Sequence, residues 1–258
     1  PAPAENAPES ATLQALRATA TLGLGRKDEA REELQRALKK APDNAEVHLA
    51  LAQLALADGD REKAMRDLDQ ALLIDPRHRD SLLLKGDLLR SAGKPVEAAA
   101  VYREVLRIDP RHSSTRLALA GIAISDNKLE EARKEVDAAL KITPGSVQAR
   151  YTQALIDFRE KKTERARDSL ASVLKVAPDY VPALLLGGAI EYALGNLQTA
   201  EAHLNKVVKA TPNNVYALRL LGWDNVKVLQ DGIEGWKKKG GFKANELASE
   251  LANKPAGH

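Results

Sequence analysis

Cysteine is absent from the 258-residue sequence, which excludes disulfides, thiolate metal ligands and cysteine nucleophiles. The absence leaves the redox compartment open. Long hydrophobic runs are also missing, and none approaches the roughly 18 residues that a membrane-spanning helix requires. The sequence begins with proline rather than methionine, so we expect that an upstream segment has been removed, and we interpret residues 1–10 as a flexible tether.

Aromatic residues are scarce, at 3% of the chain, whereas alanine and leucine recur throughout. A β-rich core normally draws on aromatic and β-branched side chains, so this composition favours helices packed through small side chains. With 44% hydrophobic and 29% charged residues, the chain has the profile of a globular protein. We therefore predict an all-α fold.

Neither sign of charge dominates, because 39 Lys and Arg stand against 36 Asp and Glu, which leaves a net charge of +3. The charges are spread along the chain, so nucleic acid is not an expected partner. One basic run, Lys237 to Lys239, would suit a polyanion, but cations at the end of a short helix also complement its dipole. We favour the helix-end interpretation.

Prolines recur with a period of 34 residues, at positions 42, 76, 110, 144, 178 and 212. Such a period is typical of repeated helical hairpins. With each proline at position 32, six repeats span residues 11–44, 45–78, 79–112, 113–146, 147–180 and 181–214, and the first helix of an incomplete seventh spans 215–223. Since proline cannot donate the next hydrogen bond of a helix, we expect each second helix to end just before it.

Other repeat positions fit two closely packed helices. Position 20 is alanine in all six repeats, which allows a close helix crossing: Ala30, Ala64, Ala98, Ala132, Ala166 and Ala200. Positions 24 and 28 are always apolar and form a core stripe. Position 15, between the helices, calls for a left-handed turn residue: Gly25, Gly59, Gly93, Asn127, Lys161 and Gly195. We expect a distorted turn at Lys161, which is neither glycine nor asparagine.

These features resemble the tetratricopeptide-repeat (TPR) family over residues 11 to about 222. The resemblance implies a superhelical solenoid that binds a protein or peptide partner. Residues 177–222 are further similar to the TPR-repeat lipoprotein that accompanies the exosortase (PEP-CTERM) sorting system and exopolysaccharide genes. That similarity implies a periplasmic or outer-membrane-associated protein with a lipid anchor upstream of this chain, and a cytoplasmic location stays open as the alternative.

The 34-residue pattern stops after Gly222. Residues 220–241 resemble the closing segment of a rhodanese domain, with matches at Leu221, Gly222, Asn225, Val226, Val228, Leu229, Gly232, Ile233 and Trp236. The persulfide-forming cysteine of that family is missing, so sulfurtransferase chemistry is not available. We interpret residues 224–258 as a capping tail, with an extended segment at 225–229 and a helix carrying Leu247 and Leu251, or as a fused fragment.

No catalytic, cofactor or metal site is predicted, and we expect the chain not to be an enzyme. His78 and His112 both stand in the sequence DPRH, and repeat copying explains them better than metal binding, because no acidic residue or histidine stands three or four residues after either one. Paired glutamates such as Glu32 and Glu33 suit helix starts. Ser113 precedes a helix as a cap rather than as a nucleophile.

In TPR proteins the concave face is lined by positions 5, 9 and 12 of the first helices. The partner-binding groove predicted here consists mostly of apolar residues at or beside those positions: Leu49, Gln53, Leu56, Leu83, Asp87, Arg90, Leu117, Ile124, Tyr151, Leu155, Phe158, Arg159, Leu185, Tyr192, Tyr216 and Arg219. The alternative is that these side chains only pack between helices. Because position 5 is leucine or tyrosine, a carboxylate clamp built from lysine and asparagine is not expected.

The leading hypothesis is therefore a binding scaffold that holds a peptide or helix in this groove during exopolysaccharide or protein-sorting assembly. We expect the partner on repeats 5 and 6, where the aromatic residues gather, and expect it to be apolar with some acidic character. Two alternatives remain: an inactive remnant or subunit of a TPR–rhodanese fusion, and a structural spacer without a saturable partner. The oligomeric state is left open.

Overall fold

The structure is a computed structural model that describes residues 7–221, and these residues contain thirteen α-helices and no strand. The prediction of an all-α fold is therefore confirmed. The chain divides into two compact units, Pro1–Thr115 and Arg116–His258, which are described separately below. The rhodanese-like segment, the extended segment at 225–229 and the helix with Leu247 and Leu251 lie outside the described residues.

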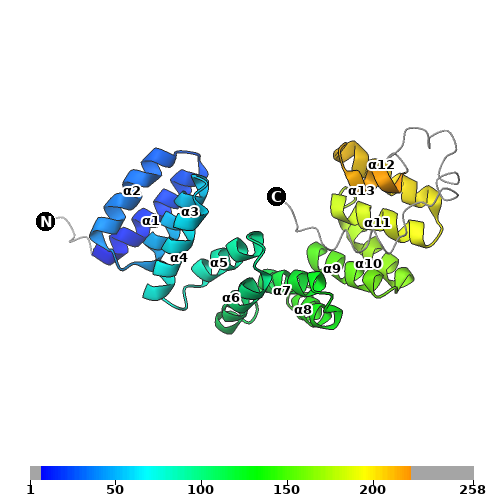
Figure 1. Cartoon of the computed structure of the whole chain (residues 1–258), viewed down its shortest axis with the longest axis horizontal. Coiled ribbons are helices and arrows are strands. Elements are labelled where there is room, and N and C mark those ends of the chain that lie inside the picture. The colour runs from blue at the N-terminus through cyan, green and yellow to red at the C-terminus, as the bar shows by residue number, and fades with distance from the viewer. Residues whose placement is uncertain (1–6, 222–258) are drawn as a thin grey trace. The chain divides into compact units, whose positions relative to one another are not determined.

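Unit 1 is built from three helical hairpins (Figure 1). Its helices are α1 (Ala7–Gly23), α2 (Lys27–Lys40), α3 (Ala45–Ala57), α4 (Arg61–Ile74), α5 (Arg79–Ser91) and α6 (Pro95–Ile108). Helix α1 begins at Ala7, so it takes in the end of the segment interpreted above as a tether.

Unit 2 contains three further hairpins and one more helix, the first of the seventh repeat. Its helices are α7 (Ser113–Ser125), α8 (Leu129–Ile142), α9 (Val147–Arg159), α10 (Thr163–Val176), α11 (Val181–Ala193), α12 (Leu197–Ala210) and α13 (Val215–Leu220). In the described residues, no helix is both long and apolar enough to cross a membrane.

Every second helix ends two residues before its proline, as the repeat pattern predicts. The last helical residues are Lys40, Ile74, Ile108, Ile142, Val176 and Ala210. The residue that follows each of them still donates its backbone N–H into the last turn, as Ala41 does to the carbonyl of Ala37. The proline comes next and has no N–H with which to continue the ladder.

The turn residue between the two helices of each hairpin has a positive φ in every repeat. Asn127 and Lys161 have φ values of 57° and 62°, close to the 73° to 82° of the four turn glycines. The expected distortion at Lys161 is wrong, because its N–H bonds to the carbonyl of Phe158 at 3.0 Å, just as Gly93 bonds to Arg90 at 3.1 Å. The hydrogen bonds that close the helix hold lysine in a conformation that costs about 1 kcal/mol.

Small residues at positions 8 and 20 allow the two helices of a hairpin to touch. A Cβ atom added to Gly86 would lie 2.5 Å from the Tyr102 ring, and one added to Gly188 would lie 2.6 Å from Leu204. Ala132 at position 20 is fully buried. The assignment of position 20 to the helix crossing is therefore supported by the packing inside each unit, and the glycines at position 8 contribute to the same close approach.

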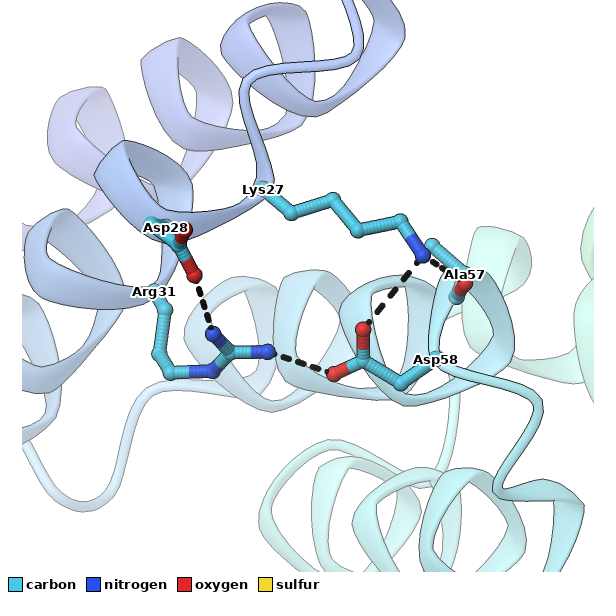
Figure 2. Close-up of polar contacts among 5 residues, drawn as sticks. All are labelled: Lys27, Asp28, Arg31, Ala57 and Asp58. Carbon is cyan, nitrogen blue, oxygen red and sulfur yellow. Dashed lines mark hydrogen bonds and ion pairs between the residues drawn. The ribbon is translucent and has the colours of Figure 1, made fainter.

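Two of the arginines at position 21, Arg31 and Arg133, connect consecutive repeats. In unit 1, Arg31 bonds to Asp28 and to Asp58 of the next repeat, each at 2.7 Å, and Lys27 approaches both Asp58 and the Ala57 carbonyl (Figure 2). These groups are exposed, with the side chains of Arg31 and Asp58 accessible at 41% and 36%. The pKa of the Asp58 carboxyl is lowered, chiefly by the hydrogen bond from Arg31.

The equivalent arginine in unit 2 lies in a more buried place. Arg133 Nη2 on α8 lies 2.7 Å from both Asp157 and Glu160 of the next repeat. The Asp157 side chain is fully buried, and its second oxygen lies 3.5 Å from Arg165 Nε. This cluster joins the fourth and fifth repeats through charges that are largely shielded from water, with the Arg133 and Glu160 side chains 17% and 13% accessible.

The outer face of α1 is apolar and exposed. Leu13 and Leu16, at positions 3 and 6, are 63% and 50% accessible, whereas Val47 and Ala50 at the same positions of the second repeat are almost fully buried. In the second repeat these positions lie on α3, which packs against the second helix of the preceding repeat. The exposed leucines therefore mark an inter-repeat face that no described residue covers.

Candidate functional site

The predicted groove residues divide by burial into two groups. Five of them are at least 92% buried in the cores of the two units: Leu49, Leu117, Ile124, Phe158 and Leu185. They present little surface to a ligand and act mainly in packing between helices. The other predicted residues are half-buried or exposed, so a partner can contact them.

In unit 1, two polar groove residues already accept hydrogen bonds from side chains of neighbouring helices. Gln53 Oε1 accepts a hydrogen bond from Thr19 at 2.9 Å, across the first two repeats. Asp87 accepts one from the Tyr102 hydroxyl at 2.5 Å. Leu56 and Leu83 are half-buried, and Arg90 is exposed. Among the groove residues of unit 1, this leaves no aromatic side chain for a partner.

In unit 2, the groove residues that are not fully buried include three tyrosines. Tyr151 on α9 meets Tyr180 at the start of α11 edge to face, with ring centroids 5.7 Å apart and ring planes at 82°. Burial, assisted by the neighbouring Tyr180, raises the pKa of Tyr151 to about 12. Both phenols can donate a hydrogen bond.

Tyr180 was not among the predicted groove residues. It stands at position 34 of its repeat, at the loop end where His78 and His112 stand in earlier repeats. The signal that could have identified Tyr180 is its repeat position, because side chains at position 34 contact the first helix of their own repeat. His78 does so through Glu46, with 3.3 Å between Nε2 and Oε2.

Three further residues extend the apolar surface beyond this pair. Leu155, Tyr192 and Tyr216 come from α9, α11 and α13, and all three are half-buried. Helix α11 packs against both α9 and α13 inside unit 2, so these residues lie on neighbouring first helices. Burial raises the pKa of Tyr192. The surface is thus an array of large apolar and phenolic groups.

Two arginines border the same helices. Arg159, the last residue of α9, donates from Nη1 to the Ile124 carbonyl at 2.9 Å, and its Nε is buried without an acceptor. Burial lowers the pKa of Arg159. Arg219 on α13 is half-buried.

The histidines at the repeat starts make local contacts. The Nδ1 atom of His78 lies 2.8 Å from the Ser81 hydroxyl, and that of His112 lies 2.7 Å from the Thr115 hydroxyl. Across residues 7–221, no group of three or more His, Asp or Glu side chains could hold a metal ion. The two copies of DPRH therefore position side chains at helix starts.

Comparison of the sequence with family models finds tetratricopeptide repeats along the described part of the chain. One Tetratricopeptide repeat model matches residues 89–156 and 157–223, and a second matches residues 15–80 and 49–113. The chain belongs to the tetratricopeptide-repeat family. Proteins with this fold typically bind protein or peptide partners, and the TPR assignment suggests an interaction scaffold.

Solved structures of other TPR proteins share the fold. PilF of Pseudomonas aeruginosa is 18% identical with a TM-score of 0.74, covering 85% of this chain and 100% of its own. PilW, a widely conserved type IV pilus biogenesis factor, is 20% identical with a TM-score of 0.70, covering 82% and 98%. YrrB, a TPR protein with an unusual peptide-binding site, is 18% identical with a TM-score of 0.57, covering 72% and 95%. No curated protein sequence matches the chain.

Proposed function

We propose that this TPR protein is a binding scaffold whose partner, a peptide or a helix, docks on the first helices of unit 2. The docking surface, called the aromatic face below, consists of Tyr151, Leu155, Tyr180, Tyr192 and Tyr216. The observation that carries the proposal is the gathering of four half-buried tyrosines: three lie on α9, α11 and α13, and Tyr180 directly precedes α11. Unit 1 contains a single tyrosine, Tyr102, and it is buried.

Aromatic side chains suit this role on physical grounds. Each buries a large area against a partner while fixing only two side-chain torsions, and truncating a central one commonly costs about 2 kcal/mol of binding free energy. The phenol groups add hydrogen-bond donors to an apolar surface. A partner with apolar side chains and backbone or carboxylate acceptors therefore fits the aromatic face.

We assign the scaffold to the cell envelope, in the assembly of exopolysaccharide or sorted proteins. Two observations support the assignment: the similarity of residues 177–222 to the exosortase-associated lipoprotein, and the fold shared with PilW, a pilus biogenesis factor. Fractionation of native host cells carrying a tagged full-length gene tests it. Recovery with the membrane or periplasmic fraction is expected, and recovery with the cytoplasmic fraction alone would contradict it.

The binding surface itself is tested with a matched pair of double variants. Leu155→Ser with Tyr192→Ser removes two half-buried groups from the aromatic face, and Phe158 is left intact because it belongs to the core. Leu73→Ser with Val176→Ser removes two groups that are 75% and 72% exposed at the ends of second helices. Circular dichroism confirms that each variant is folded.

Affinity capture from an envelope extract of the native host, with quantitative mass spectrometry, then compares the three proteins. We expect one set of partners to be retained by the wild type and by the Leu73/Val176 variant and to be lost with the Leu155/Tyr192 variant. Equal recovery of every bound protein by all three would reject the aromatic face. Absence of any saturable partner would favour the structural-spacer alternative.

A further inference from the structure

Arg159 stands at the end of α9 with most of its hydrogen-bonding capacity unused. A guanidinium carries five N–H donors, and within the described residues 7–221 only Nη1 has an acceptor, the Ile124 carbonyl at 2.9 Å. Its Nε atom is buried and has no acceptor. Among residues 7–221, no carboxylate forms an ion pair with this guanidinium.

Other arginines of unit 2 with similar burial are neutralised. Arg133 bonds to Asp157 and Glu160, each at 2.7 Å, and Arg116 bonds to Glu135 at 2.9 Å. Leaving a partly buried cation without a counter-charge is unfavourable, because the low-dielectric surroundings weaken its solvation. Arg159 therefore differs from Arg133 and Arg116 because no carboxylate of the described residues is paired with its charge.

A purely structural role accounts for only part of this arrangement. The Ile124 carbonyl lies at the end of α7, where a cation complements roughly half a negative charge of the helix dipole. That carbonyl already accepts the N–H of Asn127 at 3.0 Å. One shared carbonyl satisfies neither the remaining donors of the guanidinium nor its full charge.

We propose that Arg159 anchors a carboxylate of the partner that occupies the aromatic face, an inference that rests on the proposed function. A carboxylate accepts charge-assisted hydrogen bonds from arginine, and one bound to this guanidinium would supply the missing counter-charge. Arg159 follows Tyr151 by eight residues on α9, a rise of about 12 Å, with Leu155 between them. The ligand is thus a peptide with an apolar side chain and, about four extended residues away, a carboxylate.

Nuclear magnetic resonance of the full chain tests the anchor with two small probes. The probes are 3-phenylpropionate and the uncharged 3-phenylpropionamide. The propionate is long enough for its ring to contact Leu155 while its carboxylate reaches Arg159, because these two residues are one helical turn, or about 6 Å, apart on α9. We expect the propionate to shift the Nε–H resonance of Arg159 saturably, and to bind at least tenfold more tightly than the amide. Arg159→Gln should reduce propionate affinity at least tenfold while leaving amide affinity unchanged.

Two further variants separate binding from folding. Arg150→Gln is the matched control, because Arg150 also lies on α9 and also donates to a backbone carbonyl, that of Pro144, but is exposed. It should leave propionate binding unchanged. Arg159→Lys keeps the charge at the end of α7 but loses the planar fork, so it should bind the propionate with intermediate affinity.

The outcomes test the carboxylate contact of Arg159 separately from the aromatic face. If both probes bind equally and Arg159→Gln changes neither, the anchor is refuted while the aromatic face remains supported. If the propionate binds but shifts a different arginine, or if neither probe binds, the anchor is also refuted. The aromatic face is judged separately, by the affinity capture with the Leu155 and Tyr192 double variant.

Discussion

The junction between repeats 1 and 2 in unit 1 and the junction between repeats 4 and 5 in unit 2 use the same residue in different surroundings. Arg31 and Arg133 both occupy position 21, and both reach an acidic residue of the next repeat at 2.7 Å. Asp58 is 36% accessible, whereas Asp157 is fully buried. The contacts are alike, but their energetic weight depends on how much water reaches them.

The junction between repeats 2 and 3 shows what replaces the arginine. Position 21 there is Met65, which lines a small apolar pocket together with Leu88 and Ala92. An apolar residue is thus compatible with this place in the repeat. Methionine at position 21 is consequently a natural substitution with which to compare the two charged junctions.

The largest expected effect is on the buried junction. Arg133→Met should destabilise the protein by about 3 kcal/mol, because it leaves Asp157 buried with only Arg165 near it. Arg31→Met should leave the unfolding midpoint unchanged, since Asp58 stays hydrated. Urea unfolding followed by circular dichroism measures both variants. Equal destabilisation would show that burial does not set the difference between the junctions.

The next effect compares two helical glycines of unit 2. Gly188→Ala should cost about 1 to 3 kcal/mol, because the new Cβ would lie 2.6 Å from Leu204. Gly121→Ala meets nothing within 4 Å and should instead stabilise the protein by about 0.5 to 1 kcal/mol. Thermal melting of the two variants checks the opposite signs. If both variants were destabilised, the open space around Gly121 would be contradicted.

A smaller effect distinguishes the turns of the two units. All three hairpin turns of unit 1 have glycine at the left-handed position, while unit 2 has Asn127, Lys161 and Gly195. Lys161→Gly should stabilise unit 2 by up to about 1 kcal/mol, because glycine adopts this conformation without steric cost. The reverse change in unit 1, Gly59→Lys, should lower the melting temperature. A melting temperature that falls with Lys161→Gly would contradict the turn geometry.

The repeat register could be predicted from the sequence because each of its signals is local. The prolines end helices, the position-20 alanines allow helices to cross, and the position-15 residues form turns, and all three assignments agree with the structure. The outcome at Lys161 differed because closing hydrogen bonds outweigh a modest backbone preference. The register therefore follows from chemistry within about 20 residues of chain.

Less of the candidate site could be predicted from the sequence. Leu185 and Phe158 occupy groove positions, yet both are buried, because packing between neighbouring repeats depends on side chains far apart in the sequence. Tyr180 and Asp157 gain their importance from such contacts, with Tyr151 and Arg133. The unused donors of Arg159 are likewise visible only once its surroundings are known.

Site-specific photo-crosslinking in living host cells tests the central claim most directly. A photoreactive phenylalanine analogue would replace Tyr192 or Leu155 on the aromatic face and, as controls, Leu73 or Val176 on exposed positions of second helices. The account predicts that the same partner is crosslinked at both aromatic-face positions and at neither control position. Crosslinks to that partner from Leu73 and Val176, with none from Tyr192 and Leu155, would contradict it.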